Sequence, residues 1–183
     1  MKNIAFIGTS HIHTPNFISR VNSNNHINCI GVWDKDKNRS KSDSEKLKCK
    51  NYEDYIDLLK EPNLDGVIVC SETNLHYELV KKITENKKHC FIEKPLGIGK
   101  KDSFEMANLI ESSNIIFQTG YFMRSNPVYI KLKDLITTNY FGEISRIRLV
   151  NCHDGIMRDI FKKYQWMTAV SYTHLTLPTT VRV

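Results

Sequence analysis

No apolar run in this 183-residue sequence approaches the roughly 20 residues that a membrane-spanning helix requires. The first residues, MKNIAFIG, contain too short an apolar segment and no small-residue cleavage site, so we expect no secretory signal. A content of 40% hydrophobic and 25% charged residues is typical of a globular protein that buries a core. We therefore expect a cytoplasmic protein with no membrane partner.

The five cysteines include no C-x-x-C pair. Cys29, Cys70 and Cys90 lie in or beside apolar, strand-like runs, which indicates small core residues in a reducing compartment. A disulfide framework is therefore not expected.

The net charge of +6 comes largely from the segment KDKNRSKSDSEKLKCK, residues 35–50. Acidic residues are mixed into this segment and no aromatic residues interrupt it, a pattern typical of a solvated helix face. A nucleic-acid interface would be expected to combine basic and aromatic side chains, so we expect no nucleic-acid partner.

Strand-like and helix-like segments alternate along most of the chain. Thr14 and Pro15 indicate a helix start, with a hydroxyl N-cap followed by proline at the first helical position. Short apolar runs predict strands at residues 3–7, 27–33, 65–70, 89–93 and 115–121. Helices are predicted after Thr14, after Asp34, at about 52–59, at 74–86, and from residue 102 or 103.

This alternation with short connections predicts an α/β fold, a doubly wound parallel sheet with helices on both faces. In such a sheet, ligands bind beyond the carboxyl ends of the strands, at the topological switch point. The chemically interesting residues fall at those ends, at residues 8–13, 34, 71–76, 93–95 and 121–124.

The pattern changes after Asn126. The segment NPVYIKLKDLITTN indicates a helix, and GEISRIRLVNCHD, residues 142–154, indicates a long strand because its apolar residues partly alternate. We interpret this region as the start of a second domain.

The first predicted strand ends at Gly8, but the second and third glycines of the fingerprint G-x-G-x-x-G are missing. Ser10 and His13 stand in their places. The Ser10 side chain would crowd a pyrophosphate, although its hydroxyl could donate to an oxygen, and His13 would push the first helix away from the strand. We expect altered or weakened binding of a dinucleotide.

Asp34 follows the second predicted strand. A carboxylate there can accept both ribose hydroxyls of an adenosine and would repel the 2′-phosphate of NADP. The alternative is an ordinary helix N-cap. Because Lys35 and Arg39 could accommodate a 2′-phosphate, NAD is the favoured cofactor and NADP remains an alternative.

Polar residues also follow the third and fourth predicted strands. Hydroxyl and amide groups after the third strand can bond a nucleotide at a helix N-terminus, whereas ordinary capping by Thr73 or Asn74 explains only one of them. After the fourth strand, Lys94 can polarise a hydroxyl or carbonyl, and Glu93 can hold its orientation. An isolated Glu-Lys-Pro would indicate only a surface turn.

The ordered segments IAFIGTSH, GVWD, DGVIVCSETNLHYEL, CFIEKPLG and QTGYFMRSNP resemble the glucose–fructose oxidoreductase / inositol dehydrogenase / MocA family (Gfo/Idh/MocA) over about residues 2–166. The motif T-N-x-H, followed at this spacing by E-K-P, is the part of the resemblance that is specific to this family. The resemblance implies an NAD(P)-binding Rossmann domain at 1–122 and the start of a substrate and oligomerisation domain at 123–168. The implied function is hydride transfer between a nicotinamide cofactor and a sugar, inositol or related polyol, in a full-length homo-oligomer.

The resemblance also implies roles for particular residues. Lys94 would be catalytic, facing both the nicotinamide and the substrate hydroxyl, while Asp34 would bind the adenosine ribose and Glu93 the other ribose. The cofactor-binding residues would be Gly8, Thr9, Ser10, His11, Asp34, Ser71, Thr73, Asn74, His76, Glu93, Lys94 and Arg124.

The last residues depart from the family pattern. A downstream Asp and His, which complete the substrate site in the family, are not recognisable, and VSYTHLTLPTTVRV resembles translated adapter sequence. We expect a truncated, inactive fragment with a foreign tail at 169–183, and its incomplete second sheet could make it fold poorly. A dinucleotide sensor without turnover is the alternative function.

His11 and His13 also suggest a metal site, because residues two apart on an extended segment share a side. Further ligands would have to come from Cys152, His153 or Asp154, far along the chain. Two ligands and a distant third do not provide the four protein ligands of a structural metal site or the three of a catalytic site. We therefore expect no metal.

Overall fold

The computed structural model describes residues 1–150 and 164–168, and these divide into two units between Gly120 and Tyr121. The predicted tail at 169–183, and Cys152, His153 and Asp154, lie outside the described residues. In the described part of the chain, no helix has the length and apolar character needed to cross a membrane.

The first unit is built on a six-stranded sheet in which all the paired strands are parallel. Its spatial order is β3-β2-β1-β4-β5-β6, so the chain first builds outward from β1 in one direction and then in the other. The strands are β1 (Lys2–Ile7), β2 (Ile27–Trp33), β3 (Lys50–Asn51), β4 (Gly66–Val69), β5 (His89–Ile92) and β6 (Phe117–Thr119). This order confirms the predicted doubly wound α/β fold and places the topological switch point between β1 and β4.

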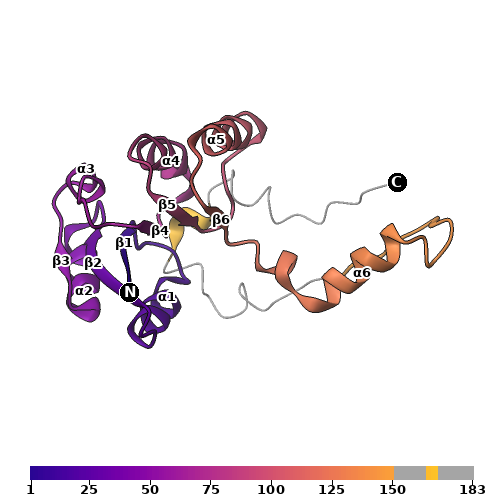
Figure 1. The fold of residues 1–183 in the computed structure, drawn as a ribbon, viewed down its shortest axis with the longest axis horizontal. Helices are drawn as coiled ribbons and strands as arrows, with labels where there is room; N and C mark the ends of the chain where they lie inside the picture. Colours follow the sequence, from indigo (N-terminus) through magenta and orange to yellow (C-terminus); the bar gives the residue numbers. More distant parts are fainter. Residues whose placement is uncertain (151–163, 169–183) are drawn as a thin grey trace. The chain divides into compact units, whose positions relative to one another are not determined.

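Helices cover both faces of the sheet (Figure 1). They are α1 (Thr14–Asn22), α2 (Lys37–Leu47), α3 (Tyr55–Leu59), α4 (His76–Glu85) and α5 (Lys100–Ser113), with a 3-10 turn η1 (Thr73–Leu75) before α4. One core cluster contains Ile18 and Val21 of α1 and Leu47 of α2. The other contains buried residues of α3, α4 and α5. The two core clusters therefore bury both faces of the sheet, as parallel sheets require.

The register of the sheet brings the ends of four strands to one edge. Ile7, the last residue of β1, pairs with Trp33 of β2 and with Val69 of β4. Val69 pairs in turn with Ile92 of β5. The residues that next leave the sheet side by side are Gly8, Asp34, Cys70 and Glu93.

Several predicted helix starts were wrong by a few residues. Helix α1 begins at Thr14 itself, so His13 rather than Thr14 occupies the N-cap, and its side chain makes no capping hydrogen bond. Asp36 caps α2 by accepting from the backbone of Asn38 and Arg39, so the alternative role of Asp34 as the cap is also wrong.

The other differences concern shorter elements. Asp54 caps α3, which begins at Tyr55 rather than near residue 52, and α5 begins at Lys100. No side-chain cap precedes η1 or α4, so simple capping by Thr73 or Asn74 is not observed. Strand β3 was missed because its two residues are polar and form no apolar run.

The second unit begins with a 3-10 turn η2 (Phe122–Ser125) and continues into α6 (Pro127–Thr137); a further turn, η4, spans Gln165–Thr168. Helix α6 confirms the helix predicted there, with Asn126 accepting from the backbone of Val128 as its cap. The predicted strand over residues 142–154 is wrong for its described part, because residues 144–150 form no strand. Partial alternation of apolar residues is not sufficient, since a strand also needs a neighbour with which to pair.

Candidate dinucleotide-binding site

Backbone hydrogen bonds tie the ends of the central strands into one edge. Gly8 N donates to Trp33 O over 2.8 Å, and Cys70 N donates to Gly8 O over 3.1 Å. Glu93 N donates to Val69 O over 2.9 Å. The loops that follow β1, β2, β4 and β5 therefore start from fixed positions at the switch point, where ligands of doubly wound sheets bind.

Gly8 makes the tight turn that opens the first loop. Its φ of 75° lies in the left-handed region, which favours glycine. A Cβ added at Gly8 would collide with the Cβ of Ser71 and lie 2.7 Å from the Ser71 Cα. This position requires glycine both for its conformation and for the close approach of the loop after β4.

The rest of the first loop is buried and anchored. Thr9, Ser10 and His11 are all buried. His11 N donates to Cys70 O over 2.9 Å, and Thr14 N donates to His11 O over 3.0 Å as α1 begins. The loop is therefore held against β4 and leads directly into the N-terminus of a helix, where the helix dipole favours an anion.

Asp34 is buried and accepts hydrogen bonds from three residues. Its Oδ2 accepts from Thr9 N at 2.6 Å, Thr9 Oγ1 at 3.1 Å and Arg39 Nε at 3.0 Å. Its Oδ1 accepts from Arg39 NH2 at 2.7 Å and Asp36 N at 2.8 Å. A ribose that approached this carboxylate would have to exchange for some of these donors.

The contact between Arg39 and Asp34 was not predicted from the sequence. Burial opposes its charge, but its hydrogen bonds and ion pair with Asp34 outweigh burial and raise the Arg39 pKa. Glu72 lies 3.9 Å from the same guanidinium and 2.9 Å from Lys35 Nζ. The edge around Asp34 is thus a cluster of both charge signs, and it contains both cations that could accommodate a 2′-phosphate.

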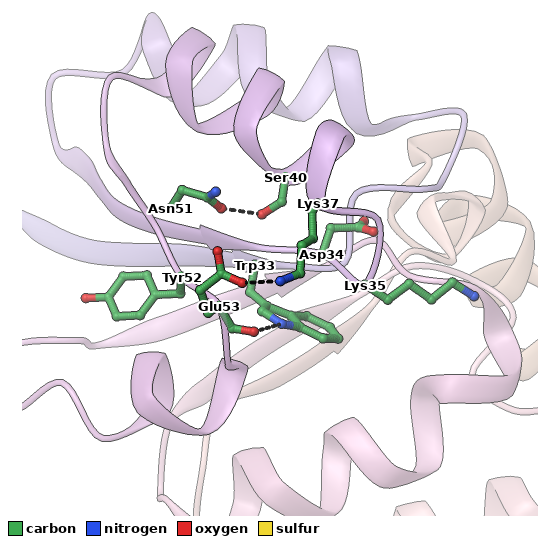
Figure 2. A pocket seen from close by; sticks show the side chains of 8 residues that line it. All are labelled: Trp33, Asp34, Lys35, Lys37, Ser40, Asn51, Tyr52 and Glu53. Carbon is green, nitrogen blue, oxygen red and sulfur yellow. Dashed lines mark hydrogen bonds and ion pairs between the residues drawn. The ribbon is translucent and has the colours of Figure 1, made fainter.

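A pocket of about 150 Å³ lies beside Asp34, at the ends of β2 and β3 (Figure 2). Figure 2 shows Lys37 reaching Glu53, at 2.7 Å, and Ser40 reaching Asn51, at 2.5 Å. Of the predicted site residues, only Asp34 lines it. The lining residues are Trp33, Asp34, Lys35, Lys37, Ser40, Asn51, Tyr52 and Glu53.

Glu93 forms a second cluster with the two histidines of the first loop. The carboxylate is buried, its Oε1 lies 2.9 Å from His13 Nδ1, and its Oε2 lies 4.0 Å from His11 Nε2. Oε2 also accepts from Lys94 N at 2.8 Å. Burial alone would raise the Glu93 pKa, but the hydrogen bonds and the two histidines lower it, so Glu93 is ionised at neutral pH. His13, which replaces the third glycine, is therefore oriented toward the carboxylate.

His11, His13 and Glu93 bring three metal-ligand atoms within 4.8 Å of one another, a closer set than the one considered from sequence. His11 Nδ1 accepts from His13 N at 3.2 Å, so a neutral His11 ring carries its proton on Nε2, the nitrogen that faces Glu93. Burial lowers the His11 pKa to about 3, which keeps that ring neutral. In the described structure, hydrogen bonds link His13 to both His11 and Glu93, and the absence of a metal stays a prediction.

The loop after β4 and the turn after β5 are joined by His76. Its ring is buried and its Nδ1 lies 3.0 Å from Leu96 O, two residues beyond Lys94. Burial lowers the pKa of His76 and keeps it neutral. Ser71 and Thr73 are buried beside it, whereas Asn74 is exposed and Lys94 is half-buried.

Arg124, also predicted to bind the cofactor, lies in η2 of the second unit and is exposed. Its backbone N donates to Tyr121 O over 3.0 Å. Its role stays a prediction.

The parallel sheet with its switch point, and the glycine turn and carboxylates gathered there, define a dinucleotide-binding α/β unit. A model of the oxidoreductase family with an NAD-binding Rossmann fold, GFO_IDH_MocA, matches residues 2–121. Since this match covers more than half of the chain, the chain belongs to that family. Its place in an oxidoreductase family with an NAD-binding fold confirms the predicted class of protein and of cofactor.

Curated relatives include dehydrogenases that act on inositol. The chain is 35% identical to the myo-inositol 2-dehydrogenase of Thermotoga maritima over 102 residues, 56% of this chain and 30% of the relative. It is 28% identical to the scyllo-inositol 2-dehydrogenase (NAD(+)) of Bacillus subtilis over 132 residues, 72% of this chain and 38% of the relative. The chain thus spans well under half the length of these relatives.

Solved structures support the fold. The scyllo-inositol dehydrogenase of Lactobacillus casei, with bound NAD(H) and scyllo-inositol, superposes with a TM-score of 0.72 at 19% identity. That match covers 87% of this chain and 48% of the other. A probable dehydrogenase from Thermotoga maritima superposes with a TM-score of 0.66 at 30% identity, covering 76% of this chain and 42% of the other.

Proposed function

We propose that the whole protein is an NAD(P)-dependent dehydrogenase that acts on an inositol, a sugar or a related polyol, and that residues 1–120 bind its dinucleotide. The observation that carries the proposal is the convergence of Gly8, Asp34 and Glu93 at the switch point of the sheet. The inositol dehydrogenases among the relatives support the substrate class.

The pyrophosphate would lie over the turn from Gly8 to His11. Gly8 itself carries no side chain and packs closely on Ser71, and the N-terminus of α1 supplies a favourable dipole. Thr73 and Asn74 would line the groove from the loop after β4.

We assign the adenosine ribose to Asp34. A ribose hydroxyl would take the place of one of the donors that now bond this carboxylate, and the exposed side of Arg39 makes its guanidinium the most exchangeable of them. NAD is the proposed cofactor. Lys35 and Arg39 make NADP the alternative, because both cations lie at the same carboxylate edge.

Lys94 would be the catalytic residue. A bound nicotinamide supplies the acceptor or donor of the hydride. Lys94 would hold or take the proton of the substrate hydroxyl as the carbonyl forms, and Glu93, bonded to the backbone of Lys94, would fix where that side chain starts.

Other parts of the proposal concern the whole protein. Residues 123–168 would begin its second domain, a homo-oligomer would form through that domain, and the location would be cytoplasmic. The likeness to the family supports each of these expectations.

A dinucleotide sensor without turnover is the second candidate. It is favoured by the saturated hydrogen bonding of Asp34 and by His13 in place of the third glycine, both of which would alter the binding of a cofactor. Oxidation of inositol by a chain that includes the second domain would exclude the sensor.

The experiment is a titration of NADH fluorescence with residues 1–183. We expect the wild type to enhance the emission, Asp34→Asn and Asp34→Ala to weaken binding by about tenfold, and Asp57→Ala to match the wild type. Asp57 is an exposed carboxylate in α3 and serves as the matched control. Equal binding by wild type and both Asp34 variants, or no binding by a folded wild type, would overturn the assignment.

A further inference from the structure

Two thiols lie side by side away from the candidate dinucleotide site. Cys29 is in β2 and Cys49 follows α2, and their Sγ atoms are 3.7 Å apart, with Cys29 donating to Cys49. Both are partly exposed, whereas Cys70 and Cys90 are buried. Among the described cysteines, this pair therefore combines contact with access to solvent.

The backbone before and after Cys49 fixes the position of this residue next to Cys29. Lys48 adopts a left-handed conformation with φ 51°, which turns the chain from the end of α2 toward β3. Cys49 N donates to Ser44 O over 3.0 Å, and the next residue, Lys50, pairs with Gly31 of β2. A disulfide needs the two sulfur atoms at about 2.05 Å, so the Sγ atoms must approach by about 1.7 Å.

The two thiols are not equivalent. The hydrogen bond from Cys29 lowers the pKa of Cys49, against the opposing effect of burial. The same hydrogen bond, together with burial, raises the pKa of Cys29. Cys49 is also flanked along the chain by Lys48 and Lys50. Because the thiolate is the nucleophile, Cys49 is the thiol that reacts first with an oxidant.

We propose that Cys29 and Cys49 form a reversible dithiol–disulfide site that takes a peroxide as its oxidant. The Cys49 thiolate attacks a peroxide oxygen, the O–O bond breaks, and Cys49 becomes a sulfenic acid while the leaving hydroxide takes a proton to become water. Cys29 then loses its proton and attacks Cys49 Sγ, forming the S–S bond and releasing a second water. Two thiols are oxidised and one peroxide is reduced to two waters.

The disulfide would enclose the segment between β2 and β3, which carries Asp34 and Arg39. Closing a loop of this size restricts the unfolded chain, so oxidation should raise the Tm by about 5–10 °C. This inference does not depend on what the strand ends bind.

The experiment uses the full chain with Cys152→Ser, which removes the thiol outside the described residues from exchange. The folded protein is treated with hydrogen peroxide, its remaining thiols are alkylated, and peptides are mapped by mass spectrometry without reduction. We expect one linked pair, Cys29–Cys49, about 2 mass units lighter than the two thiol peptides and reversed by dithiothreitol. Cys70 and Cys90 should be alkylated only after unfolding.

Single variants test the order of attack. In Cys29→Ser, Cys49 should still be oxidised, to a sulfenic acid that a dimedone probe traps. In Cys49→Ser, Cys29 should stay reduced over the same exposure. Absence of the linked peptide from the folded protein would overturn the site, and oxidation of Cys29 at an unchanged rate in Cys49→Ser would overturn the assignment of Cys49 as the attacking thiol.

Discussion

Asp34 and Arg39 are joined by two hydrogen bonds, with Arg39 Nε at 3.0 Å from one carboxylate oxygen and NH2 at 2.7 Å from the other. A bidentate pair of this kind is stronger and more directional than a single ion contact. Because the Asp34 side chain is only 1% exposed, the guanidinium neutralises a charge that water does not reach. The pair therefore holds in place the carboxylate that we assign to the ribose.

Replacement of Arg39 by alanine is expected to destabilise the fold by about 1–3 kcal/mol, because a buried carboxylate loses two donors while its bonds to Thr9 and Asp36 remain. Urea unfolding measures this difference. Lys37→Ala is the matched control, since it removes an exposed ion pair to Glu53 and should cost less than Arg39→Ala. Equal losses in the two variants would show that the Asp34–Arg39 pair stabilises the fold no more than an exposed ion pair does.

Gly8→Ala should be strongly destabilising, by about 2–4 kcal/mol, because it combines a left-handed φ with a collision against Ser71. Thermal unfolding checks the loss. Adding Ser71→Gly should recover only a small part of the loss, because it removes the contact with the Ser71 Cβ but leaves the added Cβ 2.7 Å from the Ser71 Cα. Gly99→Ala, where an added Cβ meets nothing within 4 Å, is the control and should remain near wild type.

The positions of Gly8, Asp34 and Glu93 could be predicted from sequence because each directly follows an apolar run. Once the strands are parallel, their carboxyl ends must meet at one edge, and the register of the sheet confirms this for all three residues. Periodicity and strand ends were therefore enough for the fold and for the location of the candidate site.

The partners of these residues could not be predicted in the same way. The contact of Arg39 with Asp34 depends on where α2 begins, which the Asp36 cap decides and the sequence left open by two residues. The contact of Cys29 with Cys49 depends on a left-handed turn at Lys48, a residue that rarely adopts that conformation. Both contacts arise from local backbone geometry that hydrophobic patterning does not encode.

Acid sensitivity should depend on His76. Its pKa in the folded protein lies below the ordinary 6.5, so as the pH falls below about 6.5 the unfolded chain binds a proton that the folded chain does not. Folding stability contributed by the neutral ring is therefore complete above pH 6.5 and is lost progressively as the pH falls. The variant His76→Asn can keep a donor toward Leu96 O. When the pH is lowered from 6.5 to 5.5, its free energy of unfolding should fall by about 1 kcal/mol less than that of the wild type.

Urea unfolding at a series of pH values measures this difference. His26→Asn is a suitable control, because His26 is an exposed histidine outside the core. Parallel pH profiles for wild type and His76→Asn would contradict the prediction.

The hydrogen bond between His13 and Glu93 should stabilise the fold. His13→Ala removes the 2.9 Å partner of a buried carboxylate, and we expect a loss of about 1–2 kcal/mol at neutral pH. The Glu93 pKa is lowered in the folded protein, so this stabilisation is present above the ordinary value of 4.5 and is lost as the pH falls below it. The difference between wild type and His13→Ala in urea unfolding should therefore shrink at pH 4 and below.

His13→Gln, which restores a donor, should recover part of the loss, and exposed His26→Ala should leave stability unchanged. A loss that is independent of pH would indicate that His13 acts through packing at the start of α1 rather than through Glu93.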